Sequence, residues 1–292
     1  MSPVPRTAGT DSRRGLALVS PPFIYALVML VAPLAAIVQF SFWTQDFLTI
    51  DRTFTLDNYR AAVTDPLYGE LLFRSLRIAG AVTVVTVLLA FPVAYFVSFH
   101  VAPGRKALWL FLITIPFWTS YLIRVFLWRV ILAFDGPING TLTGLGIIGQ
   151  PLGWILYNAN AVIITLAHAF APFAILPIFV SLEKLDRTLL EAARDLGETR
   201  TMTFLRVTLP LAMPGVLAAG LIVFIPTIGD YVTPRLVGGS GGTMIANMIH
   251  TQFMRLNNAP LGAALAVLAM LSVTLVSVAF ILITRHWTRG GR

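Results

Sequence analysis

The stretch EAARDLGETRTMTFLRVTLPLAMPG, residues 191–215, is the longest polar stretch between two strongly apolar segments in the second half of the chain. Asp186 precedes it and can cap a helix, because its carboxylate accepts hydrogen bonds from free backbone N–H groups. Gly197 predicts the end of that helix, since glycine adopts the left-handed conformation freely. A second short helix is expected over 200–207, and Pro210 is expected to end it.

The first helix of this stretch carries an apolar stripe at helical spacing. The stripe consists of Leu185, Leu189, Ala192, Ala193 and Leu196. One interpretation is an amphipathic loop at the membrane surface that only joins two spanning helices. The two alanines between Glu191 and Arg194 favour another, because small side chains let the surface of a second protein approach closely.

The composition places the chain in a membrane. Of its 292 residues, 57% are hydrophobic and 12% are charged, whereas soluble domains carry about 25% charged residues. The apolar segments are spread evenly, which indicates one all-α integral membrane domain. The chain has no cysteine, which excludes disulfides, thiolate metal sites and cysteine nucleophiles.

Six segments are long and apolar enough to span a bilayer as helices, which takes about 20 residues. They are residues 15–43, 78–101, 107–134, 154–182, 211–229 and 261–284. This divides the chain into an N-terminal tail (1–14), a six-helix domain (15–285) with a loop at 183–210, and a C-terminal tail (286–292).

The basic residues set the orientation of these six helices. With the N-terminus in the cytoplasm, 13 of the 21 Lys and Arg residues face the cytoplasm and 6 face outward. The remaining two, Arg124 and Arg129, lie inside the third span. The sequence therefore predicts N-in and C-in, and the net charge of +8 reflects membrane topology instead of nucleic-acid binding.

In this orientation the 191–215 stretch is cytoplasmic, and there it resembles the signature of permease subunits in binding-protein-dependent ABC importers. That signature is Glu-Ala-Ala, three residues, Gly, nine residues, then an aliphatic residue, any residue and Leu-Pro. This chain has Glu191-Ala192-Ala193, then Gly197, then Val207-Thr208-Leu209-Pro210. Every spacing matches, with valine in place of the commoner isoleucine.

Three further segments resemble the spermidine/putrescine branch of that family. They are FTLDNYRAAV (54–63), IPFWTSYLIRVFLWRVIL (115–132) and FIPTIGDYVTPRLVGG (224–239). The resemblance implies a type I ABC importer permease fold with six transmembrane helices in the bacterial inner membrane. It also implies partners: an ATP-binding subunit dimer that holds ATP and Mg²⁺, a second related permease that makes a heterodimer, and an outer solute-binding protein.

The same resemblance implies that this chain has no catalytic residue and moves its solute by coupling to the ATPase. Glu191 and Arg194 are expected to pair with charges in a groove of the ATPase, while Ala192 and Ala193 permit close contact. Gly197 would set the bend of the docking segment. Leu209 and Pro210 would lead the chain back into the membrane.

Charges inside a bilayer are costly, so Arg124 needs a counter-charge or access to the surface. On a straight third helix rising at about 1.5 Å per residue, Arg124 lies at about the same height as Asp230 at the end of the fifth helix. We expect either an ion pair between Arg124 and Asp230, or two side chains that reach the outer surface separately.

A polyamine cargo would need carboxylates for its amines and aromatic faces for its methylenes. The candidates for its pathway, all near the outer level of the membrane, are Asp230, Tyr231, Asp135, Trp118, Trp128 and Arg124. The alternatives are that the tryptophans form an interfacial belt or pack in the core, and that Asp230 orders the end of a helix. A ligand role for His168, in the fourth span, is less expected than simple packing.

Other functions remain open at this point. The same machine could carry ferric iron, thiamine, phosphonate or another small solute. A secondary transporter or channel would leave the 191–210 motif unexplained. A membrane enzyme would need clustered acids, histidines or a nucleophile within the spans, and the four histidines are dispersed with no metal-ligand cluster.

Overall fold

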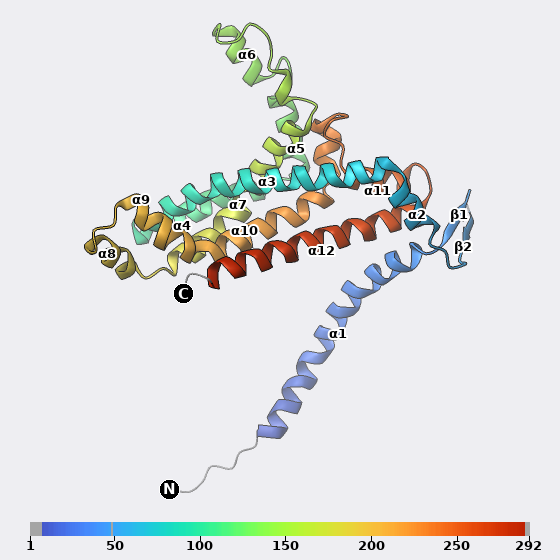
Figure 1. Cartoon of the computed structure of the whole chain (residues 1–292), viewed down its shortest axis with the longest axis horizontal. Helices are drawn as coiled ribbons and strands as arrows, with labels where there is room; N and C mark the ends of the chain where they lie inside the picture. The colour runs from blue at the N-terminus through green and yellow to red at the C-terminus, as the bar shows by residue number, and fades with distance from the viewer. Residues whose placement is uncertain (1–7, 48, 290–292) are drawn as a thin grey trace.

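The computed structural model describes residues 8–47 and 49–289, and these are mostly helical (Figure 1). Of the predicted tails, 1–14 and 286–292, residues 1–7 and 290–292 lie outside the described residues, while 8–14 belong to α1 and 286–289 to α12. The α-helices are α1 (Ala8–Phe40), α2 (Asp57–Thr64), α3 (Pro66–Phe99), α4 (Pro103–Thr114), α5 (Tyr121–Ile131), α6 (Pro137–Gly144), α7 (Ala159–Glu183), α8 (Arg187–Asp195), α9 (Arg200–Thr203), α10 (Leu209–Gly229), α11 (Ile245–Met254) and α12 (Ala259–Arg289).

Short elements connect these helices. β1 (Thr44–Asp46) pairs antiparallel with β2 (Thr49–Asp51) after α1. The tight turns η1 (Ile115–Trp118) and η2 (Gly153–Ile155) have 3₁₀ geometry, and the wide turns η3 (Phe204–Thr208) and η4 (Pro234–Gly238) have π geometry.

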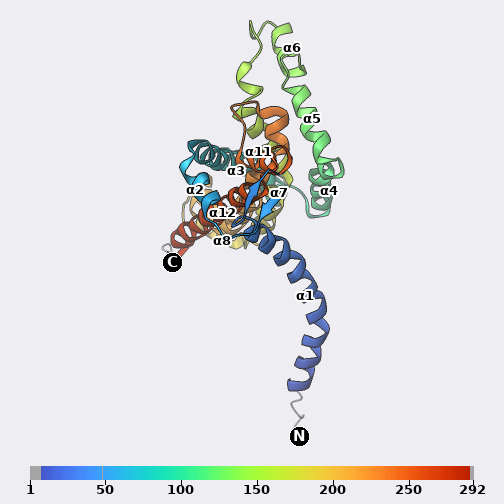
Figure 2. The same ribbon diagram turned by 90° about the vertical axis from the view of Figure 1, so that its right-hand side faces the viewer.

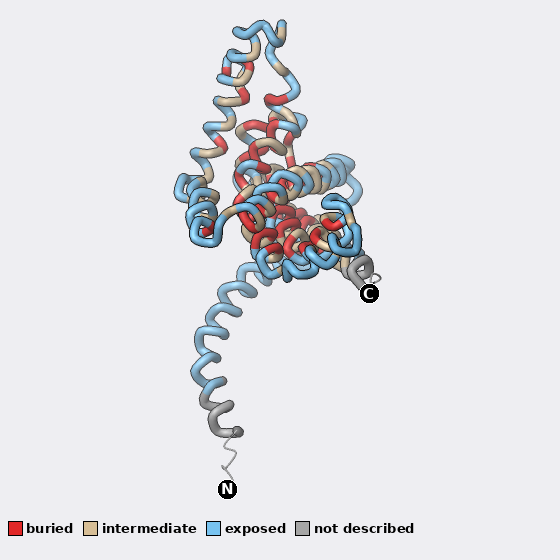
Figure 3. The backbone as a smooth tube through the Cα atoms, turned by 90° about the vertical axis from the view of Figure 1, so that its left-hand side faces the viewer, coloured by how far each residue is buried: buried red, intermediate tan, exposed pale blue. Residues whose placement is uncertain are grey.

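Helices α3, α7 and α10 form the core of the bundle (Figures 1 and 3). Their facing side chains are small or β-branched and fully buried, as at Val82 and Ala94 on α3, Val162 on α7, and Ala219 and Val223 on α10. Small residues let membrane helices approach closely. Dispersion contacts between the helices can then hold them together, because the hydrophobic effect does not favour helix association in lipid.

α7 and α10 approach each other closely at Gly215. A Cβ at this position would lie 2.6 Å from the carbonyl oxygen of Pro177 and would also meet the side chain of Ser181. Only a residue without a side chain fits between the two backbones, so Gly215 sets the distance between α7 and α10.

Five helices of the described residues are long and apolar enough to span a membrane, and a bent pair of helices makes a sixth span if it crosses as one unit. The bent pair consists of α4 with η1, followed by α5, and it bends by 86°. Pro116 lacks a backbone N–H, and Thr119 and Ser120 adopt extended conformations that stop the helical ladder. The prediction of one straight helix over 107–134 is therefore wrong. The height in the membrane that this prediction gave for Arg124 is wrong as well.

Two parts of the chain leave the bundle in opposite directions (Figure 2). α5 and α6 project on one side, and α1 projects on the other and contacts the bundle through α12. None of the most apolar stretch of α1 is buried (Figure 3). Lipid or another protein must cover such a surface, because a large exposed apolar patch is unfavourable in water.

The segment after Gly197 differs from the expected arrangement. The second short helix does not end at Pro210, because α9, η3 and α10 run as one helix from Arg200 to Gly229. In the π turn, Leu209 N–H donates to the carbonyl oxygen of Phe204, five residues back. The wider turn accommodates the missing N–H of Pro210, which lies in the first turn of α10.

The predicted orientation names one end of the bundle cytoplasmic and the other outer. α8, α9 and the C-terminal end of α12 lie at one end, whereas α2, α11 and the β1–β2 hairpin lie at the other (Figure 1). This is the arrangement that the predicted N-in, C-in orientation requires for the cytoplasmic loop and the C-terminus.

Replacement of Gly215 by alanine should destabilise the bundle by about 1–3 kcal/mol, because the new methyl group has no space between α7 and α10. Gly80→Ala on α3 is the matched control, since a Cβ there meets no atom within 4 Å. Unfolding of the purified protein in detergent measures both. Equal stability of the two variants would show that α7 and α10 are not fixed at this contact.

Candidate functional site

The cytoplasmic helix α8 is closed at both ends by its own sequence. At its start, the Asp186 carboxylate accepts a hydrogen bond from Thr188 N–H at 3.0 Å. At its end, Gly197 has φ +88°, its N–H donates to Arg194 O at 2.9 Å, and Glu198 N–H donates to Ala193 O at 3.1 Å. These two bonds form a Schellman motif. The predicted start and stop of this helix are confirmed.

The hydrogen bonds from Thr188 to Asp186 lower the pKa of the Asp186 carboxyl, because they stabilise the charged form. A lowered pKa means that the cap contributes stability above the carboxyl's unfolded-state pKa. That contribution is lost only as the pH falls through the folded-state pKa. The cap is therefore fully charged at neutral pH.

α8 presents its motif residues to the surroundings. Glu191, Ala192, Arg194 and Gly197 are exposed and Ala193 is half-buried, while none of the residues of α8 is buried. Of the predicted apolar stripe, Leu185 packs against the core of the bundle, whereas Leu189 is 48% and Leu196 87% exposed. An exposed apolar and charged face on a capped helix is a surface suited to contact with another protein.

α8 is anchored to the bundle by residues that the sequence analysis did not identify as part of the site. Arg187, at its first turn, donates to Ser98 O at 3.1 Å and lies over the Phe99 ring at the end of α3. Glu183, at the end of α7, accepts from Lys106 Nζ at 2.6 and 2.8 Å and from Ser98 Oγ at 3.2 Å. These contacts tie α3, α4, α7 and α8 together at the cytoplasmic end.

The other end of the motif is attached as well. Glu198 pairs with Arg206 at 2.6 Å, and the Thr199 hydroxyl caps α9 through Met202 N–H. Phe204 lies edge-on against Phe91 and Tyr95 of α3. The segment of the motif from Gly197 to Leu209 and Pro210 thus covers a turn that enters α10 directly, with Leu209 half-buried and Pro210 exposed.

A second group of polar contacts lies at the outer end, where α10 stops. Asp230 Oδ1 accepts from Val232 N–H at 2.9 Å and Thr233 N–H at 3.3 Å, and Oδ2 accepts from the Tyr121 hydroxyl at 2.6 Å. The Tyr121 and Thr233 hydroxyls are 2.7 Å apart. Asp230 therefore orders the break between α10 and η4 and ties it to α5.

Arg124 lies beside this group without joining it. Its Nη1 is 3.5 Å from Ala169 O, its Nε is buried without a partner, and its guanidinium lies near the rings of Phe117 and Tyr121. Arg124 and Asp230 form no ion pair among the described residues, since the Asp230 oxygens bond to Tyr121 and the backbone. Of the two expected arrangements the direct ion pair is absent, and Tyr121 contacts both Asp230 and Arg124.

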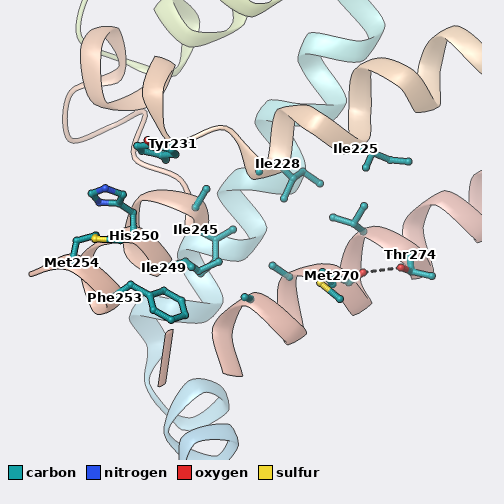
Figure 4. A pocket seen from close by; sticks show the side chains of 15 residues that line it. Ile225, Ile228, Tyr231, Ile245, Ile249, His250, Phe253, Met254, Met270 and Thr274 are labelled. Carbon is teal, nitrogen blue, oxygen red and sulfur yellow. Dashed lines mark hydrogen bonds between the residues drawn. The ribbon is translucent and has the colours of Figure 1, made fainter. Parts of the chain in front are cut away.

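The remaining pathway candidates lie on different sides. Trp128 donates through Nε1 to His168 Nδ1 at 3.1 Å, one turn along α5 from Arg124. Tyr231 stacks on His250, with ring centroids 4.7 Å apart, at the edge of a cavity of about 560 Å³ (Figure 4). Trp118 is 78% exposed and lies against the Phe111 ring, and Asp135 lies exposed in the turn after α5.

One sequence signal could have revealed the role of Tyr121. Tyr121, Arg124 and Trp128 recur at intervals of three and four residues, so they share one face of α5. This face meets α7 and η4, whereas the opposite face of α5 is apolar and exposed. The spacing marks the inner face of α5, but it does not identify the partners on α7 and η4.

Separate loss of Lys106 or Glu183 should destabilise the protein by about 1–3 kcal/mol, because the Lys106 side chain is only 11% exposed and depends on this carboxylate. The double variant Lys106→Met/Glu183→Gln should cost less than the sum of the single ones. The control pair is Arg206 and Glu198, 64% and 30% exposed, with an expected coupling of about 0–1 kcal/mol. Equal coupling energies for the two pairs would contradict the anchor.

Tyr121→Phe removes the hydroxyl that bonds both Asp230 and Thr233, and Asp230→Asn replaces a carboxylate oxygen by an amide NH₂. If Asp230 mainly orders the break, both variants should lower the unfolding temperature, and both should change transport by a similar factor. Thermal unfolding and uptake kinetics in proteoliposomes measure these effects. A large increase of KM in Asp230→Asn alone, with unchanged unfolding, would instead make Asp230 a ligand of the cargo.

The sequence of the chain was also compared with those of known proteins. Residues 16–289 match the model of the family described as binding-protein-dependent transport system inner membrane component. The chain is 38% identical to the spermidine/putrescine transport system permease protein PotB of Salmonella typhimurium (strain SL1344) over 264 residues, which cover 90% of this chain and 89% of that protein. It is 37% identical to PotB of Escherichia coli (strain K12), covering 90% and 93%.

The fold is also found among solved structures. A crystal structure of a bacterial ABC transporter involved in the import of the acidic polysaccharide alginate superimposes with a TM-score of 0.68, at 17% identity, covering 96% of this chain and 97% of that chain. The all-α arrangement is thus the type I permease fold. This chain belongs to the family of binding-protein-dependent transport system inner membrane components, and it is a permease subunit of an ABC importer.

Proposed function

We propose that this chain conducts a polyamine, spermidine or putrescine, across the inner membrane, and that α8 is its docking helix for a separate ATPase. The observation that carries the docking role is α8 itself: a capped, exposed helix whose start is anchored to the end of α3 through Arg187 and whose end leads into α9. The cargo is inferred from similarity to polyamine permeases over most of the chain.

The coupling would depend on the rigidity of this attachment. Closure of an ATPase dimer would displace α8, whose caps at Asp186 and Gly197 keep it one helical unit. Arg187 would pass the motion to α3, and the continuous helix from Arg200 to Gly229 would pass it through the membrane. Small displacements at one site become larger ones elsewhere because packed helices move as rigid bodies.

The docking contacts would combine charge with close approach. Glu191 and Arg194 are exposed on α8 and would pair with opposite charges in a groove of the ATPase. Ala192 and Ala193 would allow that groove to come near the helix backbone. ATP and Mg²⁺ would be held by the ATPase, and this chain would contribute no catalytic residue.

The transport pathway would require a second permease chain. The exposed apolar surfaces of α1 and α5 need cover in the membrane, and a related permease in a heterodimer, together with lipid, would supply it. An outer solute-binding protein would deliver the cargo at the end where α10 stops. Asp230, Tyr231, Asp135, Trp118 and Trp128 stay candidates for contact with a cationic cargo, and Arg124, beside Tyr121, would repel its amines.

The test is uptake of labelled spermidine into liposomes that hold the chain with its ATPase, second permease and binding protein. We expect uptake that needs ATP on the ATPase side and falls at least about tenfold in Glu191→Arg, because reversal of one charge in a docked surface is costly. Arg105→Glu is the control, since it also reverses an exposed charge near the cytoplasmic surface, but outside α8.

Three outcomes would change the proposal. Uptake that is indifferent to ATP and to Glu191→Arg would contradict the docking role of α8. Equal loss in Glu191→Arg and Arg105→Glu would show that the effect is not specific to the motif. Absence of spermidine uptake, with ATPase activity stimulated by a differently loaded binding protein, would keep the importer and reject the polyamine.

A further inference from the structure

Two adjoining hollows at the outer end of the bundle differ sharply in chemistry. The first is the cavity of about 560 Å³ between α10, α11 and α12, and its lining is almost entirely apolar (Figure 4). The second has a volume of about 270 Å³ and is lined mostly by polar side chains and two arginines. Tyr231 and His250, stacked on each other, belong to the linings of both.

The two arginines of the smaller hollow, Arg235 and Arg255, have no counter-charge within the part of the chain that the structure describes. Neither forms an ion pair there, and no acidic side chain lines either hollow. The carboxylate next to Tyr231 in sequence is Asp230, and its oxygens accept from Tyr121 and two backbone N–H groups. Both side chains are exposed, so the smaller hollow is a cationic surface that an anion from outside the chain can reach.

The larger hollow lies deeper along the bundle. Its α12 residues run from Ala266 to Thr274, which places them about 10–22 Å along α12 from its outer end at Ala259. Its α10 residues, such as Ile225 and Ile228, belong to the last turns of that helix. In the N-in orientation this is the depth of the acyl chains of the outer leaflet, and the arginines lie nearer its surface.

We propose that the two hollows form one site for an anionic phospholipid of the outer leaflet. The phosphate would accept charge-assisted hydrogen bonds from Arg235 and Arg255, and an acyl chain would lie along Ile249, Phe253 and Met270. The volume of the larger hollow lies within the range of about 300–1,000 Å³ that is usual for ligand sites.

An amphiphile explains both halves of the site at once. A carboxylate of an outer binding protein would satisfy the arginines but would leave the apolar hollow open to water or lipid. An apolar helix of a second chain would cover the hollow but would leave the two arginines without an anion. The proposal rests on the orientation of the chain in the membrane and not on its cargo.

The experiment measures lipids retained by the full-length protein in detergent, by native mass spectrometry with added phosphatidylglycerol or phosphatidylethanolamine of identical acyl chains. The double variant Arg235→Gln/Arg255→Gln should bind phosphatidylglycerol about 30-fold more weakly than the wild type. Ala266→Phe, which fills the apolar hollow and keeps both arginines, should also weaken binding. Arg60→Gln, an exposed arginine on the outer side in α2, is the matched control and should bind as the wild type does.

The source of the anion is tested separately. Inorganic phosphate should not compete with phosphatidylglycerol at millimolar concentration, because it lacks the acyl chain. Competition by phosphate together with normal binding in Ala266→Phe would replace the lipid by a free anion. Equal retention of phosphatidylglycerol in the double variant and in Arg60→Gln would overturn the site. If the glutamine variants unfold, Arg235→Lys/Arg255→Lys, which should keep binding, provides the comparison with Ala266→Phe.

Discussion

The structure depends on the close approach of α7 and α10, which is possible because Gly215 has no side chain. The Pro177 carbonyl and the Ser181 side chain occupy the space that a Cβ would need. Since α8 connects the end of α7 to the start of the α9–α10 helix, the distance between those two helices also sets the span that α8 must bridge. A packing contact inside the membrane thus fixes the geometry of the cytoplasmic motif.

The cytoplasmic end and the outer end use polar groups in different ways. At the cytoplasmic end, Glu183, Lys106 and Arg187 join helices that are far apart in sequence, and the motif residues themselves stay exposed. At the outer end, Asp230 and Tyr121 bind a helix break to α5. Carboxylates that carry structure in this way have fewer free lone pairs for a ligand, which limits what Asp230 can offer to a cationic cargo.

Local signals were sufficient where one short segment determines its own conformation. Asp186 and Gly197 delimit α8 because a capping carboxylate and a left-handed glycine act within a few residues. The apolar segments identified five continuous spans for a similar reason, since each must satisfy its backbone internally in lipid. Pro210 misled this type of inference, because a π turn at Phe204–Thr208 absorbs the missing N–H and the helix continues.

The sequence by itself determined the membrane class, five of the spans, and the place of the 191–210 motif between two of them, because hydropathy and motif spacing are linear properties of the chain. Only the tertiary structure decided the 86° break before α5, the pairing of Lys106 on α4 with Glu183 on α7, and the position of Tyr121 beside Asp230. The two pairings join residues that are 77 and 109 positions apart. Many pairings at such separations satisfy the same linear pattern, and helix packing selects one of them.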